Sequence, residues 1–163
     1  MQDHYNVLFL CTGNSARSIM AEALLNRKGK PKFTAYSAGS HPSGRVRPEA
    51  LKQLKIAGLP VEGLRSKGWE EFAKPDAPQM DFVFTVCDTA AAETCPIWPG
   101  HPMSGHWGIP DPAAVAGTPE EIERGFREAL VLLERRISLF LALPLSGLDH
   151  IALKTEFDRI GRG

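Results

Sequence analysis

Short apolar runs alternate along the chain with segments of helical periodicity. Continuous apolar runs predict buried strands, and apolar residues that recur every three or four positions predict helices. The predicted strands are residues 5–10, 32–37 and 80–86, and the predicted helices are residues 16–28, 47–57, a short one at 66–72, and the segment between Thr118 and Pro144. Because strands alternate with helices, we expect an α/β fold in three layers, a mainly parallel sheet with helices on both faces.

The last of these helices has clear start and stop signals. Thr118 is the predicted N-cap, and Glu121 can complete a capping box with it. Pro144 ends the helix, and apolar residues beyond it predict a small additional helix. We therefore divide the 163 residues into one domain, residues 1–144, and a short helical tail, residues 145–163, packed on the same domain.

Composition and charge exclude several classes of protein. The 19 basic and 19 acidic residues balance, so charge gives no argument for a nucleic-acid or membrane partner. The first residues lack the pattern of a signal peptide, and no apolar run approaches the length of a membrane span, so we expect a cytoplasmic protein. The cysteines number three, which argues against a disulfide framework and favours catalysis, redox exchange or metal binding.

The segment Cys11–Ser18 follows the apolar run Val7–Leu10 and leads into a predicted helix. A turn at this place points backbone N–H groups and the positive end of the helix at one spot above the Cys11 sulfur. Arg17 adds a planar cation that can hold two oxygens of a tetrahedral oxyanion. These charges favour the thiolate of Cys11, to which Ser18 could donate a hydrogen bond. The candidate oxyanion-binding residues are Thr12, Gly13, Asn14, Ser15, Ala16, Arg17 and Ser18.

Other interpretations fit this segment less well. It lacks the Gly-Lys ending of a Walker loop, and it lacks the second and third glycines of a dinucleotide-binding fingerprint. A buried structural cysteine beside a surface arginine is the remaining alternative. We favour a loop that holds phosphate, or an anion like it, against an activated sulfur nucleophile.

Two further cysteines, Cys87 and Cys95, form a second candidate group. Because Cys11 and Cys87 both follow predicted strands, a parallel sheet brings them to the same edge. Eight residues of intact helix span ~12 Å, beyond the ~7 Å that a disulfide allows, so a Cys87–Cys95 bond needs an unwound segment, as in a redox switch. A buried strand-end thiol and an incidental loop cysteine are the alternative. Zinc bound by these cysteines with His101 and His106 is another, but the cysteine spacing is wider than in structural zinc sites.

Asp111 stands between two prolines, which hold it on a stiff loop. An oxyanion transferred to sulfur loses an oxygen that must be protonated, and Asp111 could supply that proton as a general acid. The alternative is that the Asp-Pro pair only starts a turn. The Cys11 loop makes the catalytic interpretation the more consistent one.

The chain resembles the low-molecular-weight protein tyrosine phosphatases, and more closely the thiol-dependent arsenate reductases that share their fold. The resemblance covers about residues 5–143 and rests on Val7–Ser18, Ser37–Gly39, Arg65–Lys67, Val86–Cys87, Cys95–Pro96 and His106–Pro112. It implies a four-stranded sheet. Phosphatases of this fold usually carry aromatic residues after the Asp-Pro pair, where this chain has Ala113 and Ala114, and they do not need Cys87 and Cys95. Both features favour the reductase, with a phosphatase acting through a phosphocysteine as the alternative.

The resemblance implies a thiol relay that reduces arsenate to arsenite. Cys11 attacks arsenate held by the loop and Arg17, and Asp111 protonates the departing oxygen. Cys87 then attacks Cys11 and releases arsenite, and Cys95 attacks Cys87, which moves the disulfide outward. Thioredoxin, or glutathione with glutaredoxin, is the expected electron donor, and the latter could leave Cys95 idle.

The remaining expectations concern partners and ions. We expect a monomer with no metal, cofactor, nucleic-acid or membrane partner. Relatives that bind potassium have an acidic residue near the position of Lys67, whose charge would repel a cation, so we expect no potassium requirement. The resemblance also implies that Asn14 braces the loop, with Ser37 as a candidate partner. An oxyanion or redox sensor without turnover is the non-enzymatic alternative.

Overall fold

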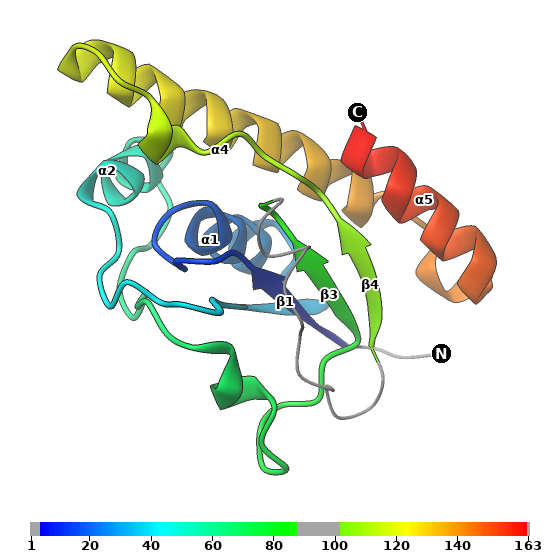
Figure 1. Ribbon diagram of the computed structural model, residues 1–163. Coiled ribbons are helices and arrows are strands. Elements are labelled where there is room, and N and C mark those ends of the chain that lie inside the picture. Colours follow the sequence, from blue (N-terminus) through cyan, green and yellow to red (C-terminus); the bar gives the residue numbers. More distant parts are fainter. Residues whose placement is uncertain (1–3, 88–101, 163) are drawn as a thin grey trace.

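The computed structural model describes residues 4–87 and 102–162 (Figure 1). The strands are β1 (Tyr5–Leu10), β2 (Phe33–Ala38), β3 (Phe82–Thr85) and β4 (Met103–His106). The α-helices are α1 (Arg17–Lys28), α2 (Pro48–Ile56), α4 (Pro119–Leu141) and α5 (His150–Arg162). Three short 3-10 helices are η1 (Trp69–Phe72), η2 (Pro112–Ala114) and η3 (Leu145–Gly147).

The four strands are parallel and lie in the order β2-β1-β3-β4. Leu8 of β1 pairs with Tyr36 of β2 on one side and with Val83 of β3 on the other. The chain leaves β1 toward β2 and later returns to β3 on the opposite side, so the strand order switches direction beside β1. Ligands of open parallel sheets bind outside the carboxyl ends of the strands at such a point. Cys11 follows β1 and Cys87 lies two residues after β3, so both are at this place.

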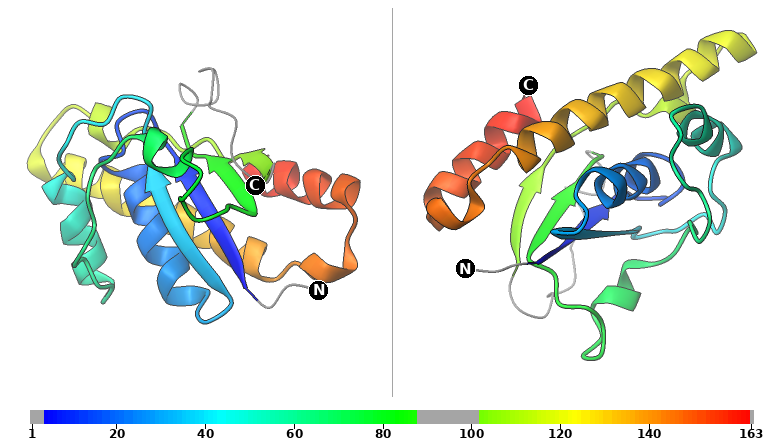
Figure 2. Two further views of the ribbon diagram at one scale, coloured as in Figure 1. Left: turned by 90° about the horizontal axis from the view of Figure 1, so that it is seen from below. Right: turned by 180° about the vertical axis from the view of Figure 1, so that it is seen from behind.

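Alternate side chains of the strands bury two different cores. Val7 and Phe9 of β1 belong to the larger core with α1, α2, α4 and α5, whereas Leu8 and Leu10 pack with η1 and Met80 on the other face. Figure 2 shows the four α-helices gathered on one side of the sheet. The predicted α/β fold with a four-stranded parallel sheet is confirmed. Among the described residues, the helix that packs on the second face of the sheet is the short 3-10 helix η1.

Strand β4 was not predicted from the pattern. Its four residues are Met-Ser-Gly-His, and only Gly105 is buried, so the run lacks the apolar character of β1 and β3.

The start of α4 follows the prediction closely. Thr118 Oγ1 accepts a hydrogen bond from the N–H of Glu121, whose carboxylate accepts one from the N–H of Thr118. This capping box fixes the first turn of a 23-residue helix.

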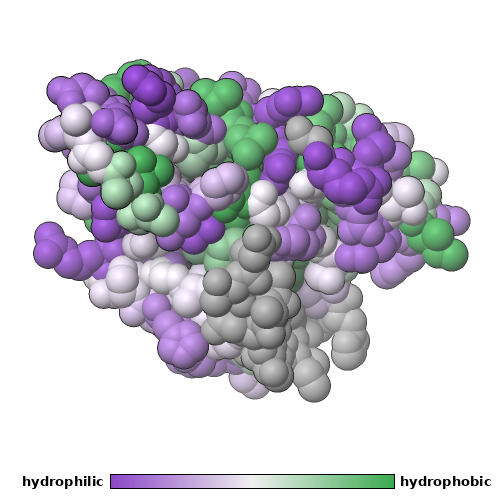
Figure 3. Space-filling view, turned by 45° about the horizontal axis from the view of Figure 1, so that its top comes forward, coloured by the Kyte–Doolittle hydropathy of each residue, from purple (hydrophilic) through white to green (hydrophobic). Residues whose placement is uncertain are grey.

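The surface is mixed in character. Figure 3 shows hydrophilic residues over most of one face, with hydrophobic residues in narrow strips between them. The large apolar side chains that are exposed in residues 4–87 and 102–162 come from separate segments: Ile56, Val115, Val131 and Ile151. Among the described residues, no helix combines the length and the apolar character needed to cross a bilayer.

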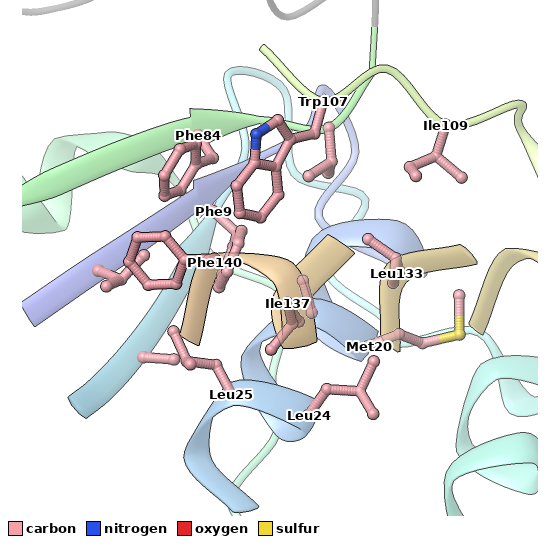
Figure 4. Packing of buried hydrophobic residues seen from close by; sticks show 14 of the residues in the cluster. Phe9, Met20, Leu24, Leu25, Phe84, Trp107, Ile109, Leu133, Ile137 and Phe140 are labelled. Carbon is pink, nitrogen blue, oxygen red and sulfur yellow. The ribbon is translucent and has the colours of Figure 1, made fainter. Parts of the chain in front are cut away.

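Aromatic rings link the sheet to α4 and α5 in the larger core. Trp107, directly after β4, stacks on Phe84 with ring centroids 3.9 Å apart, and Phe140 of α4 meets both rings edge-on (Figure 4). Phe157 of α5 is fully buried and packs edge-on against Phe84. The helical tail therefore shares the core of the sheet.

Candidate active site

The loop after β1 is fixed from its outer side. Three of its carbonyl oxygens accept hydrogen bonds from backbone N–H groups of the segment that follows β2. The bonds run from His41 N–H to Thr12 O at 2.9 Å, from Ser43 N–H to Gly13 O at 3.0 Å, and from Arg47 N–H to Ser15 O at 2.8 Å. With these carbonyls bonded outward, the N–H of Thr12 donates to Cys87 and the N–H of Gly13 faces Cys11, so these loop amides point at the sulfurs beside the start of α1. Such a concave set of amides at a helix N-terminus binds anions.

Asn14 is the internal brace of this loop. It is fully buried and has a φ of 45°, a conformation that Asn tolerates better than most residues. Its amide donates to Ser18 Oγ at 2.8 Å and accepts from the N–H of Lys67 at 2.9 Å. The expected brace is therefore present, with Ser18 and Lys67 as partners in place of Ser37.

Gly39 lets the end of β2 lie directly against the loop. A Cβ atom there would lie 2.5 Å from Thr12 O, 2.8 Å from Cys11 O and 3.0 Å from Asn14 N. The neighbouring Ala38 O accepts a hydrogen bond from the N–H of Cys11 at 3.2 Å. Only glycine fits this close approach of two backbones.

Cys11 and Cys87 are both buried and form no disulfide, and their side chains are in hydrogen-bonded contact. The Cys87 sulfur also accepts a hydrogen bond from the N–H of Thr12 at 3.3 Å and lies 3.6 Å from its hydroxyl oxygen. The parallel sheet thus brings together two cysteines 76 positions apart in the sequence.

The protonation of this pair differs from the prediction. The hydrogen-bonded contact with Cys87 and burial raise the pKa of Cys11, whereas the charge of Arg17 and the N–H of Gly13 lower it. Arg17 and the loop therefore favour the thiolate of Cys11 as expected, but contact with a second sulfur and burial outweigh them. Two thiols in contact lose their protons in steps that belong to the pair. Ser18, expected to donate to Cys11, makes no hydrogen bond to it within the described residues; its hydroxyl accepts from Asn14.

Arg17 and Asp111 meet beside the loop. Arg17 Nη1 donates to Ile109 O at 2.9 Å, and its Nη2 lies 3.7 Å from Asp111 Oδ2. Asp111 Oδ1 accepts from the N–H of Ala113, so this carboxylate also starts the turn η2. Its second oxygen faces Arg17. The turn-forming role and a catalytic role are compatible in one residue.

A buried lysine lies beneath the loop. Lys67 Nζ donates to Arg65 O at 2.9 Å and to Ser37 Oγ at 3.3 Å, and it lies 3.6 Å from Glu22 Oε1. Burial lowers the pKa of Lys67 and raises the pKa of Glu22, and the attraction between the two charges opposes both shifts. Sequence analysis did not find Glu22. The available signal was its place among the buried apolar residues of α1.

The structure thus gathers most of the predicted site residues. The loop from Thr12 to Ser18, Cys11, Cys87 and Asp111 lie together at the carboxyl edge of the sheet. Cys95 lies outside the described residues, as does His101 of the zinc alternative. His106 Nδ1 is 2.7 Å from the hydroxyl of Thr85. In the part of the chain that is described, no cluster of three metal-binding side chains is present.

Comparison with known proteins places this geometry in a family. A family model for low molecular weight phosphotyrosine protein phosphatase matches residues 6–150. The chain belongs to this family. Arsenate reductase from Bacillus licheniformis is 36% identical over 135 residues, which are 82% of this chain and 93% of that protein. The resemblance predicted from the motifs is confirmed.

Solved structures of arsenate reductases agree with this comparison. Arsenate reductase from Archaeoglobus fulgidus is 29% identical, has a TM-score of 0.66, and is matched over 84% of this chain and 99% of that one. A structure described as an arsenate reductase in the phosphate binding state is 26% identical, with a TM-score of 0.70 over 85% of this chain and 97% of that one. The residues that the family model matches end at His150, the first residue of α5.

Proposed function

We propose that this chain is an arsenate reductase that works by a cysteine-thiol relay. The observation that carries the proposal is the contact between Cys11 and Cys87 at a loop fitted to a tetrahedral oxyanion. A phosphatase needs only the first of these sulfurs. The similarity to curated arsenate reductases supports the same conclusion.

The first step joins arsenate to sulfur. The loop amides and Arg17 hold the anion, the Cys11 thiol gives its proton to an oxygen of the bound arsenate, and the resulting thiolate attacks arsenic to form a sulfur–arsenic bond. One oxygen leaves arsenic as water, with the proton supplied by Asp111, which is held 3.7 Å from Arg17. Burial of both sulfurs keeps water away from the bond that forms.

The second step is the reduction. Cys87 attacks the Cys11 sulfur, the sulfur–arsenic bond breaks, and its electron pair stays on arsenic, which leaves as arsenite. A Cys11–Cys87 disulfide remains. Because the two sulfurs are already in contact, this step needs little rearrangement. The N–H of Thr12, which donates to Cys87, stabilises the attacking sulfur as a thiolate.

The final step restores the thiols. Attack by Cys95 on Cys87 would move the disulfide outward, and thioredoxin, or glutathione with glutaredoxin, would then reduce it. Cys95 lies outside the described residues, so its part in the relay stays a prediction. These donors operate in reducing compartments, and we propose the cytoplasm as the location.

The phosphatase alternative is less consistent with the surroundings of Asp111. A pocket of about 220 Å³ beside it is lined by aliphatic and polar residues, among them Ile109, Val115 and Leu132, and the described part of its wall contains no aromatic ring. A phosphotyrosine ring would therefore find little to stack on.

We propose that the protein acts as a monomer, since its exposed apolar side chains are dispersed.

The test compares wild type with Cys87→Ser in two reactions. One is arsenate-dependent oxidation of reductant, supplied either as thioredoxin or as glutathione with glutaredoxin. The other is hydrolysis of an aryl phosphate. We expect arsenate turnover in wild type that collapses in Cys87→Ser, while any aryl phosphate hydrolysis persists. A Cys95→Ser variant serves as the matched cysteine control and identifies the donor pathway. Absence of arsenate turnover with both donors, with phosphate hydrolysis untouched by Cys87→Ser, would overturn the proposal in favour of a phosphatase.

A further inference from the structure

The segment that carries Asp111, residues 107–111, continues the line of β4 and is here named the acid loop. Its first half is bonded to the end of β3. The N–H of Trp107 donates to Thr85 O at 2.8 Å, and the N–H of Ile109 donates to Val86 O at 3.0 Å. This side of the acid loop is therefore positioned by the sheet. Further contacts come from the side chains of Arg136 in α4 and Arg17 in α1, and from the backbone of α5.

Arg136 of α4 holds the acid loop from behind. Its side chain is buried, and Nη1 donates to Gly108 O at 2.9 Å. Within residues 4–87 and 102–162, no carboxylate lies close enough to form an ion pair with it, and burial lowers its pKa. An unpaired buried guanidinium destabilises a fold. Its charge-assisted hydrogen bond to Gly108 O fixes the backbone of the acid loop, which is a role that can explain a buried guanidinium at this position.

Helix α5 holds the beginning of the same loop. The indole N–H of Trp107 donates to Phe157 O at 3.2 Å. Gly161 lies so close that a Cβ atom there would be 2.3 Å from His106 O. Figure 4 shows the Trp107 ring inside the core and Ile109 further along the same segment. Phe157 and Gly161 lie beyond residue 150, where the family match ends.

Arg17 holds the next carbonyl along the acid loop and faces the acid itself. Its Nη1 bonds Ile109 O, and its Nη2 faces Asp111. Two guanidinium groups from different helices, Arg136 and Arg17, thus bind the adjacent carbonyls of Gly108 and Ile109. A shift of the Gly108 peptide would move Asp111 relative to Arg17 and the oxyanion loop.

We propose that Arg136 and Trp107 are positioning residues that set the place of the general acid Asp111. Arg136 acts through the Gly108 carbonyl, and Trp107 transmits the packing of α5. The inference rests on the proposed function, in which Asp111 protonates the departing oxygen. It gives α5, most of which lies beyond the residues matched by the family model, a role in placing the general acid.

The test is a double-mutant cycle between Arg136→Met and Asp111→Asn. We expect Arg136→Met to lower kcat by about tenfold or more with little change in KM, because small displacements of a reacting group are costly. In the Asp111→Asn background the same change should alter kcat by about twofold or less. Arg136→Lys, which can still donate to Gly108 O, should recover most of the rate. Arg135→Met, an exposed neighbour, is the matched control and should leave kcat unchanged.

The melting temperature of the variant distinguishes a positioning role of Arg136 from a role in folding alone. Replacing an unpaired buried charge by methionine is expected to leave the melting temperature unchanged or raised, so a lower kcat would not reflect unfolding. If Arg136→Met does not fold, Trp107→Phe takes its place in the cycle, since it keeps an aromatic ring and removes the N–H to Phe157 O. Equal losses of kcat in both backgrounds, or wild-type kcat in the folded variants, would overturn the proposal. Failure of the proposed function shows separately, as no arsenate turnover in wild type, and the cycle is then measured on aryl phosphate hydrolysis.

Discussion

Replacing Gly39 by alanine is the most direct test of how the oxyanion loop is held. The added methyl group would lie 2.5 Å from Thr12 O and 2.8 Å from Cys11 O. Side-chain carbons keep at least 3.0 Å from such atoms, so β2 and the loop must separate by about 0.5 Å. Misplacing reacting groups by about 1 Å can cost roughly 10²-fold, so half that displacement is expected to cost about tenfold in kcat/KM.

Stability decides whether that loss is specific. Overpacking of this kind destabilises by about 1–3 kcal/mol, and a domain has about 5–15 kcal/mol of stability, so at least roughly 95% of the variant stays folded. Unfolding therefore explains almost none of a tenfold loss. The assay is arsenate turnover together with urea unfolding and oxyanion affinity. Gly147→Ala is the control, because its methyl group meets nothing closer than Pro144 Cβ at 3.9 Å. If Gly39→Ala is folded and both affinity and kcat/KM stay within about threefold of wild type, the backbone contact does not position the loop.

Three further outcomes are expected. Cys87→Ala should lower the pKa of Cys11, because contact with Cys87 raises it; the pH profile of Cys11 alkylation should move to lower pH, and a move to higher pH would contradict the contact. Exchanging potassium for sodium should leave turnover unchanged, because the ammonium of Lys67 already lies beside Glu22. A potassium-dependent rate would show that this ammonium does not replace a bound potassium ion. Phe157→Ala should cost about 3–5 kcal/mol of unfolding free energy, since the ring is fully buried; a loss below about 1 kcal/mol would mean that α5 is only loosely packed.

The part of the site that follows a regular pattern could be predicted from the sequence. The apolar run before Cys11 and the helix after it define a strand–loop–helix unit, and parallel strands bring Cys87 to the same edge. The Asp111 segment was found because two prolines mark it. Each of these features is determined by where a strand ends or by the residues of a single turn.

The rest depends on contacts between side chains far apart in sequence. The pKa of Cys11 could not be predicted, because it depends on a sulfur that the fold brings into contact. The Lys67–Glu22 pair joins a loop to a helix 45 positions earlier. Arg136 gave a weak signal, since it shares the spacing of the buried residues Leu133 and Ile137 in α4. Periodicity marks that face but does not reveal that its guanidinium reaches Gly108.

The contact between the two thiols also has a consequence for the idle enzyme. A mild oxidant such as a peroxide converts a thiolate to a sulfenic acid, which condenses with a neighbouring thiol. Cys11 has such a neighbour in Cys87 before any substrate arrives. Burial and the raised pKa of Cys11 slow the first oxidation, but a sulfenic acid that does form is captured by Cys87 as a disulfide. The contact should therefore protect Cys11 from irreversible oxidation, because the thiols that restore the relay also reduce this disulfide.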